Sequence, residues 1–179
     1  MSQPPTHPPH LSLVLGGARS GKSRHAEAML TAIPEPWLYV ATGEAWDDEM
    51  RARIEIHRSR RARGWRTVEA PLALAEALAD AAAMPALVDC LTLWLTNLLL
   101  GEHDVPEAVD RLEQALAART APTVLVASEV GLGIVPENAL ARRFRDEAGL
   151  LHQRLARLAD HVVLVAAGLP LVLKQETAG

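Results

Sequence analysis

One eight-residue segment combines residue types and spacing that suit the binding of phosphate groups. In GGARSGKS (16–23), Gly16, Gly21, Lys22 and Ser23 stand at the defining positions of the pattern G-x-x-x-x-G-K-[ST]. Glycines let the backbone wrap closely around phosphate oxygens, while successive N–H groups and a helix N-terminus point at the negative charge. The Lys22 ammonium can reach the β- and γ-phosphates, and the Ser23 hydroxyl can ligate Mg²⁺. The segment therefore predicts a P-loop for ATP or GTP, in preference to a glycine-rich turn that binds nothing.

Two acidic residues follow apolar runs and could hold the metal that accompanies a nucleotide. Asp89 ends the apolar part of ALVDC (86–90), the arrangement of a Walker B strand. Glu129 follows TVLVAS (123–128) directly and is a second candidate. Each has a structural alternative, since Asp89 could cap the next helix and Glu129 could serve the fold alone. The predicted metal ligands are therefore Ser23 and Asp89.

A single histidine stands among many arginines in the first third of the chain. Seven arginines fall between Arg51 and Arg66, and helical spacing would place Arg53, His57, Arg60 and Arg61 on one face. Nearby cations disfavour protonation of an imidazole, so it keeps a free lone pair, and they neutralise an approaching phosphate. Those are the needs of a histidine that attacks an α-phosphorus and carries a nucleotidyl group. A solvated basic face and a nucleic-acid patch are the alternatives.

Strand-like and helix-like segments alternate along the chain and must position these residues. Strands are expected at residues 11–16, 37–41, 86–90, 123–128, 161–168 and 171–174. Helices are expected at residues 23–30, 47–63, 71–83, 92–100, 105–119 and 138–160. Gly168 and Pro170 mark a tight turn between the last two strands. The prediction is a P-loop NTPase-like α/β fold with a mainly parallel sheet, helices on both faces and a short C-terminal β-hairpin.

Length and composition indicate one ordinary globular domain. The chain has 179 residues, of which 49% are hydrophobic and 22% charged. We expect a disordered tail at 1–10, a domain at 11–174 and a short tail at 175–179. The net charge of −4 gives no general attraction to nucleic acid. One cysteine, no signal-peptide pattern and no membrane-spanning run favour a cytoplasmic protein.

Several motifs, taken in order, carry a resemblance to a known family. They are LGGARSGKSRHAE, VATGEAWDDEM, RI-x-x-HR, W-x-T-x-E, DCLTLWLTNLL and SEVGLGIVPEN, and they lie within residues 11–174. Together they resemble the bifunctional adenosylcobinamide kinase/adenosylcobinamide-phosphate guanylyltransferase of cobalamin biosynthesis. The P-loop alone would indicate only a superfamily. The other motifs, DCLTLWLTNLL and SEVGLGIVPEN above all, make the resemblance specific.

The resemblance implies two successive reactions. The first phosphorylates the aminopropanol hydroxyl of adenosylcobinamide with ATP or GTP. The second transfers GMP from GTP through a GMP-histidine, giving adenosylcobinamide-GDP and pyrophosphate. Some members carry two adjacent histidines in the RI-x-x-HR motif, but this chain has Ile56 before His57, which leaves His57 as the candidate. Family members assemble as homotrimers, and Mg²⁺ is the expected cofactor.

The resemblance also implies which residues act and which contact nucleotide. The catalytic residues are His57 and Lys22. The nucleotide-binding residues are Gly16, Gly17, Ala18, Arg19, Ser20, Gly21, Lys22, Ser23, Thr42, Gly43, Glu44, His57, Arg58, Ser59, Arg60, Glu69 and Asp89. The residues that contact the corrinoid, the role of the loop at 129–138 and the preferred phosphoryl donor are not assigned.

Three other functions are compatible with parts of the pattern. A P-loop small-molecule kinase without nucleotidyl transfer would leave His57 a bystander. A non-enzymatic nucleotide-binding switch would bind nucleotide without turning over cobinamide. A nucleic-acid-binding module could use the arginines at 51–66, but the negative net charge and the 3% aromatic content argue against it.

Overall fold

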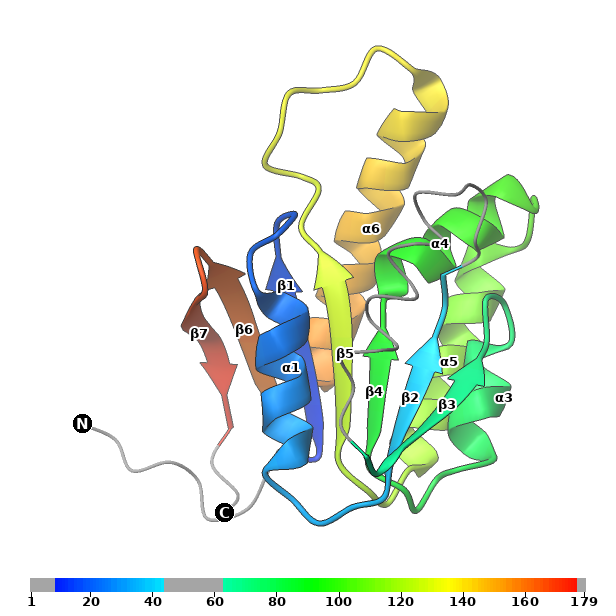
Figure 1. Ribbon diagram of the computed structural model, residues 1–179. Coiled ribbons are helices and arrows are strands. Elements are labelled where there is room, and N and C mark those ends of the chain that lie inside the picture. The colour runs from blue at the N-terminus through cyan, green and yellow to red at the C-terminus, as the bar shows by residue number, and fades with distance from the viewer. Residues whose placement is uncertain (1–8, 44–62, 177–179) are drawn as a thin grey trace.

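A seven-stranded, mainly parallel sheet organises the residues that the computed structural model describes, which are 9–43 and 63–176. The strand order across the sheet is β3-β2-β4-β5-β1-β6-β7. All neighbouring pairs are parallel except β6 and β7, which form an antiparallel hairpin at one edge (Figure 1). The strands are β1 (Leu11–Gly16), β2 (Trp37–Ala41), β3 (Trp65–Glu69), β4 (Ala86–Asp89), β5 (Thr123–Ser128), β6 (His161–Ala166) and β7 (Leu169–Gln175).

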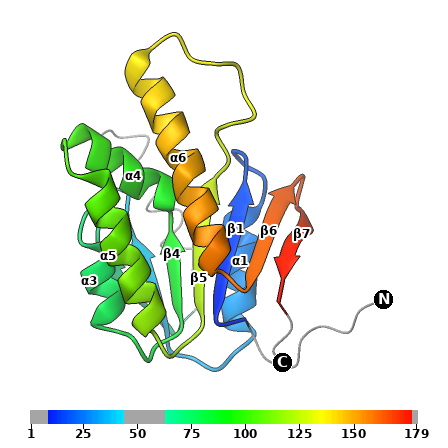
Figure 2. The same ribbon diagram turned by 180° about the vertical axis from the view of Figure 1, so that it is seen from behind.

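Helices cover both faces of the sheet, as the sequence predicts. On one face lies α1, and on the other lie α3, α4, α5 and α6 (Figures 1 and 2). The helices are α1 (Lys22–Thr31), α3 (Leu74–Ala79), α4 (Leu91–Leu100), α5 (Val105–Ala118) and α6 (Ala139–Leu158). Among the described residues, no helix is both long enough and apolar enough to pass through a bilayer.

The core consists of two clusters, one on each side of the sheet. Successive side chains of a strand point to opposite faces, so Leu13 and Leu15 join one cluster while Val14 joins the other. The larger cluster contains the fully buried Trp94 of α4, and the smaller one contains Leu30 of α1. Burial on both faces explains why these strands read as continuous apolar runs rather than as alternating patterns.

Side-chain caps set the beginnings of two helices. The Asp104 carboxylate accepts a hydrogen bond of 2.9 Å from the Glu107 N–H at the start of α5. The Asn138 carboxamide oxygen accepts one of 3.1 Å from the Ala141 N–H at the start of α6. Each bond satisfies a backbone donor that has no partner inside the helix. Asn138 therefore fixes the point at which the loop after β5 becomes α6.

The structure corrects three details of the predicted elements. Trp65–Glu69, which is absent from the predicted strands, forms the edge strand β3, whose mostly exposed side chains give no apolar run. The helix expected at 71–83 is shorter, since α3 spans Leu74–Ala79. Pro170 lies in β7 opposite Val165 instead of in the hairpin turn. An edge strand tolerates proline because its outward backbone groups need no partner strand.

A buried arginine joins elements at the opposite end of the sheet from the predicted site. Arg119 is only 3% exposed and donates to Leu78 O at 2.7 Å, Thr123 Oγ1 at 2.6 Å and Met84 O. Burial lowers the pKa of this guanidinium to about 10. The carbonyl oxygen of Arg119 lies 2.9 Å from His10 Nε2, so His10, which the sequence assigned to the N-terminal tail, contacts the domain.

Candidate active site

The carboxyl ends of five neighbouring strands bring the predicted site residues to one edge of the sheet. Gly16 ends β1 opposite Ser128, which ends β5. Asp89 ends β4 opposite Ala41, which ends β2, and Glu69 ends β3 opposite that same alanine. Open parallel sheets bind ligands just beyond this edge. The segments after β1, β2 and β4 therefore face a common region.

The loop 16–23 connects β1 to α1 and depends on the special backbone geometry of a few residues. A Cβ on Gly16 would lie 2.5 Å from Ser20 Oγ and 2.6 Å from Val165 O, so only glycine fits there. Gly21 has a φ of 94° at the N-cap position of α1, a region that favours glycine. Arg19 has a φ of 55° although it carries a side chain. Such left-handed residues turn successive N–H groups toward one side of a loop, as in an anion-binding nest.

Lys22 and Ser23 begin α1 next to the exposed part of this loop. The residues Gly17, Ala18 and Arg19 are exposed, while Lys22 and Ser23 are half-buried. The Lys22 ammonium donates to Gly17 O at 3.2 Å. This contact is exposed and exchangeable, so the ammonium can turn to a phosphate without leaving a buried group unpaired.

The turn of the β6–β7 hairpin packs against the P-loop. The Gly168 N–H donates to Ser20 O at 2.8 Å, and the Gly168 Cα lies 3.4 Å from where a Cβ on Gly21 would be. Gly168 has a φ of 80° and Ala167 a φ of 52°. The turn is predictable from the sequence but its contact with the loop is not, because no local pattern joins residues so far apart in the chain.

Asp89 is held in place by a neighbouring tyrosine. The Tyr39 hydroxyl on β2 donates to Asp89 Oδ2 at 2.8 Å. The proposal that Asp89 merely caps α4 is wrong, because the N-cap residue is Cys90 and no side chain caps this helix. Burial and the Asp89 charge raise the pKa of the Cys90 thiol to about 11. That thiol stays protonated at neutral pH, so it is no thiolate nucleophile.

Thr42 is buried instead of lining the surface. Its hydroxyl donates to Cys90 O at 2.7 Å, and its carbonyl accepts from Asn97 Nδ2 at 2.8 Å. Asn97 also donates to Pro71 O at 3.0 Å. Thr42 thus ties the segment after β2 to the start of α4, and Asn97 ties both to the segment before α3. Asn97 was not among the predicted residues. The sequence feature that marks it is a polar side chain within the mainly apolar helix 91–100.

The Glu129 carboxylate contacts the loop 129–138 and α6. Its Oε1 accepts from Gly131 N at 2.5 Å, and its Oε2 lies 3.9 Å from His152 Nδ1 on α6. Burial lowers the pKa of His152, against the opposing effect of the Glu129 charge. The backbone N–H of Glu129 donates to Gly16 O at 3.0 Å. Glu129 therefore attaches the loop 129–138 to the P-loop through its backbone, and its side chain stabilises that loop.

The oxygen ligands predicted for Mg²⁺ lie on two different elements, since Ser23 is in α1 and Asp89 ends β4. Since β5 lies between β1 and β4, the end of β1 is two strand spacings, roughly 10 Å, from Asp89 at the end of β4. Ser23 follows the loop that begins at this end of β1. The described residues contain no cluster of three or more His, Cys, Asp or Glu side chains that could bind a metal. Hydroxyl and carboxylate oxygens suit Mg²⁺, which takes much of its shell from water and phosphates. The donor set therefore fits a metal that arrives with a nucleotide.

Several predicted residues lie outside the described part of the chain. These residues are Glu44, His57, Arg58, Ser59 and Arg60, together with positions 47–62 of the helix expected at 47–63, whose last residue, Arg63, lies in a turn. Gly43 and Glu69 are described, and Glu69 is exposed at the end of β3. The structure thus places the P-loop, Asp89 and Glu69 at one edge of the sheet.

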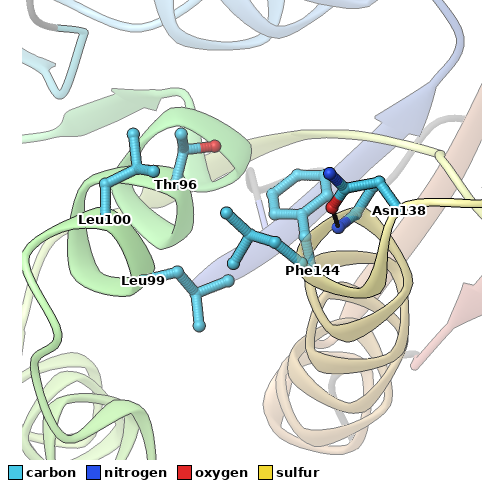
Figure 3. Close-up of a pocket in the computed structure, with 7 residues that line it drawn as sticks. Thr96, Leu99, Leu100, Asn138 and Phe144 are labelled. Carbon is cyan, nitrogen blue, oxygen red and sulfur yellow. Dashed lines mark hydrogen bonds between the residues drawn. The ribbon is translucent and has the colours of Figure 1, made fainter.

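An apolar pocket lies beside this edge, between α4 and α6. It has a volume of about 270 Å³. Figure 3 shows side chains of α4 on one side of this space and side chains of α6 on the other. The described residues that line it are Thr96, Leu99, Leu100, Asn138, Leu140, Ala141 and Phe144. None of them belongs to the P-loop, so the pocket and the phosphate-binding loop are separate features.

The fold and the loop define a P-loop NTPase-like protein. The fold is similar to that of a Pyrococcus horikoshii OT3 protein, with a TM-score of 0.55, 8% identity, and coverage of 93% of this chain and 86% of that one. It is also similar to an ATPase from the type III secretion system of pathogenic bacteria, with a TM-score of 0.50 and 11% identity over 87% of this chain and 50% of that one. At such identities these likenesses concern the fold alone.

Sequence similarity is more specific. Residues 12–173 match the family described as cobinamide kinase / cobinamide phosphate guanyltransferase, and the chain belongs to that family. It is 49% identical to the bifunctional adenosylcobalamin biosynthesis protein CobP of Pseudomonas aeruginosa, over 92% of this chain and 97% of that protein. It is 48% identical to the bifunctional protein CobU of Salmonella typhimurium, over 90% of this chain and 98% of that protein. The resemblance found from the motifs is thereby confirmed.

Proposed function

We propose that this chain phosphorylates adenosylcobinamide with ATP or GTP and then transfers GMP from GTP to adenosylcobinamide phosphate. The products of the second reaction are adenosylcobinamide-GDP and pyrophosphate. The observation that carries the proposal is the similarity to bifunctional relatives over 90% or more of the chain. A complete P-loop at the carboxyl edge of the sheet supplies the phosphate-binding element that both reactions need.

In the kinase reaction the chain positions phosphates and neutralises charge. The substrate hydroxyl oxygen attacks the γ-phosphorus, the bond from that phosphorus to the nucleoside diphosphate breaks, and the hydroxyl proton is released. We assign Lys22 to the β- and γ-phosphates, and the N–H groups of residues 16–23 to their oxygens. Ser23 and Asp89 would hold Mg²⁺, which supplies further charge neutralisation when bound. Glu69, Gly43 and the backbone near Thr42 complete the proposed nucleotide contacts.

The guanylyl transfer requires a nucleophile, and we assign that role to His57. Its imidazole nitrogen attacks the α-phosphorus of GTP, and pyrophosphate leaves. A phosphate oxygen of adenosylcobinamide phosphate then attacks the phosphorus of the GMP-histidine, and the imidazole is released. The support is the position of His57 in the RI-x-x-HR motif among seven arginines. Glu44, Arg58, Ser59 and Arg60 are proposed to bind the nucleotide in the same step.

A homotrimer and a cytoplasmic location complete the proposal. The proposed trimeric assembly is inferred from the resemblance to the family. The location rests on the biosynthetic role of the family and on Cys90, which is a free, buried thiol. Sedimentation analysis of the purified chain would measure the assembly directly.

The decisive experiment is intact-mass spectrometry of the protein after incubation with GTP and Mg²⁺. The expected result is a mass increase of one GMP per chain, which disappears when adenosylcobinamide phosphate is added and adenosylcobinamide-GDP is formed. A kinase without nucleotidyl transfer would phosphorylate adenosylcobinamide and never acquire the mass of GMP. A nucleotide-binding switch would do neither, and that outcome would reject the enzymatic proposal altogether.

A further inference from the structure

The loop at 129–138 exposes an unusual amount of apolar surface beside the P-loop. Ile134 is 97% exposed and Leu132 is 86% exposed, and Val135 is exposed as well. Large aliphatic side chains gain free energy when they leave water, so a contiguous set of them in water marks a binding surface. The loop rises beyond the carboxyl ends of the strands before it enters α6 (Figure 1). It therefore projects over the same edge of the sheet as the P-loop.

The last residue of this loop, Asn138, lines the pocket between α4 and α6. Leu140, which is 46% exposed at the start of α6, and Leu100, which is 53% exposed at the end of α4, both line the pocket. Phe144 closes it from the side of α6 (Figure 3). Each of the two polar side chains in the lining makes one internal hydrogen bond. Asn138 Oδ1 accepts from Ala141 N, and Thr96 Oγ1 donates to Thr92 O. The pocket thus offers mainly apolar contact to a ligand.

The backbone links this surface to the phosphate-binding loop. The Glu129 N–H donates to Gly16 O at 3.0 Å, so the first residue of the loop 129–138 is fixed to the first residue of the P-loop. An acceptor that is phosphorylated at a P-loop must place its hydroxyl at the γ-phosphorus, and the rest of the molecule must lie beyond the carboxyl edge. The apolar loop and pocket occupy that position.

We propose that Leu132, Ile134, Val135 and Leu140, together with the pocket between α4 and α6, bind the corrin macrocycle of adenosylcobinamide. This inference rests on the proposed function. The periphery of a corrin carries many methyl groups between its neutral carboxamides, so a surface that contacts those methyl groups is apolar and needs no charge to pair with. The pocket accepts one edge of the macrocycle, and the exposed loop side chains cover the adjoining part.

A matched pair of substitutions on α6 tests this assignment. Leu140 and Leu158 have nearly the same exposure, 46% and 45%. Leu140 lies in the first turn of α6, and Leu158, the control, lies in the last turn. We expect Leu140→Ser and Ile134→Ser to raise the KM for adenosylcobinamide in the kinase reaction by roughly tenfold, from lost apolar contact. The KM for ATP and the kcat should stay within roughly twofold of wild type, and Leu158→Ser should change none of these values.

Two direct measurements separate the possible outcomes. Equilibrium dialysis of adenosylcobinamide, without nucleotide, should show weaker binding to Leu140→Ser and Ile134→Ser than to wild type and Leu158→Ser. Unchanged corrinoid binding and KM in both variants would overturn the proposal. A lower sedimentation mass for these variants would also overturn it, since the surface would then join copies of this chain. If the wild type itself fails to phosphorylate adenosylcobinamide, the proposed function fails. Dialysis then still measures whether this surface binds adenosylcobinamide.

Discussion

Gly168 in the turn of the β6–β7 hairpin donates its N–H to the carbonyl of Ser20 in the P-loop, at 2.8 Å. The two residues are far apart in the sequence, yet this bond fixes one side of the phosphate-binding loop to the sheet edge. The φ of 80° at Gly168 is one that residues with a side chain rarely adopt. The hairpin turn is thus a backbone support for the P-loop.

The first prediction concerns Gly168→Ala. A Cβ at this position meets nothing within 4 Å. The expected loss of folding stability, about 1 kcal/mol, therefore comes from the left-handed backbone conformation alone. If the turn relaxes, its bond to Ser20 weakens, and we expect the KM for ATP and GTP to rise several-fold. Gly149→Ala in α6, which also meets nothing within 4 Å, should leave both values unchanged. Unaltered nucleotide KM values in Gly168→Ala would show that the contact does not support the loop.

Lys22→Ala should lower kinase turnover by about a hundredfold or more, because a charge that stabilises the transferred phosphoryl group is lost. Lys22→Arg should also be a poor enzyme, since the guanidinium is a planar fork and not a compact charge. Lys174, the other lysine of the chain, provides the control. Its ammonium contacts Glu176 at 2.9 Å on the outer edge of the sheet, and Lys174→Ala should retain activity. Steady-state phosphorylation of adenosylcobinamide is the measurement, and wild-type rates in Lys22→Ala would reject the assignment.

Asp89→Asn should reduce Mg²⁺-dependent activity while the fold is retained. The carboxamide oxygen can still accept the hydrogen bond of the Tyr39 hydroxyl, so the substitution removes mainly the negative charge. We expect a higher Mg²⁺ concentration for half-maximal turnover. Asp80→Asn, at the exposed end of α3, removes the same charge away from the site and should have no effect. An unchanged Mg²⁺ titration for Asp89→Asn would leave Asp89 a structural residue.

His57→Asn should abolish both GMP labelling and guanylyl transfer, while the kinase reaction largely survives. The kinase reaction needs the P-loop and the metal but no covalent intermediate. Label on the wild type should be acid-labile and base-stable, because protonation of a phosphoramidate nitrogen makes it a good leaving group. His103→Asn, at an exposed position after α4, should label normally. Persistent labelling of His57→Asn would place the nucleophile elsewhere, and loss of both activities would indicate a general structural failure.

Acid should destabilise the fold through His152, which is buried, and His161, which is half-buried. Burial lowers the pKa of His152 and, with the nearby His25 charge, that of His161 below the ordinary value of 6.5. The unfolded chain then binds more protons than the folded one, so stability is lost as the pH falls below 6.5 toward the folded-state pKa values. Urea unfolding at about pH 7.5 and about pH 5 measures this loss. The loss should be smaller in His152→Gln than in wild type, and an equal loss would show that His152 does not contribute.

Features with a contiguous signal were predictable from the sequence. The P-loop was found because glycine, lysine and serine stand at fixed spacing between an apolar strand and a helix, and β1, β2 and β5 have the predicted bounds for the same reason. Such elements depend on residues within one short segment. The edge strand β3 was missed because its exposed side chains include Arg66, Thr67 and Glu69, which carry no apolar run.

The relations between distant segments were decided only by the tertiary structure. Strand order places β5 between the P-loop strand and the Asp89 strand, and nothing in the sequence ranks the strands in space. Thr42 and Glu129 both follow strands, yet the hydroxyl of one bonds to Cys90 and the carboxylate of the other faces Gly131 and His152. Sequence specifies which chemical groups lie near the end of each strand. Which of these groups meet depends on packing and hydrogen bonds between segments that are far apart in the sequence. Such contacts form only when the sheet assembles, because bringing the segments together closes long loops of chain.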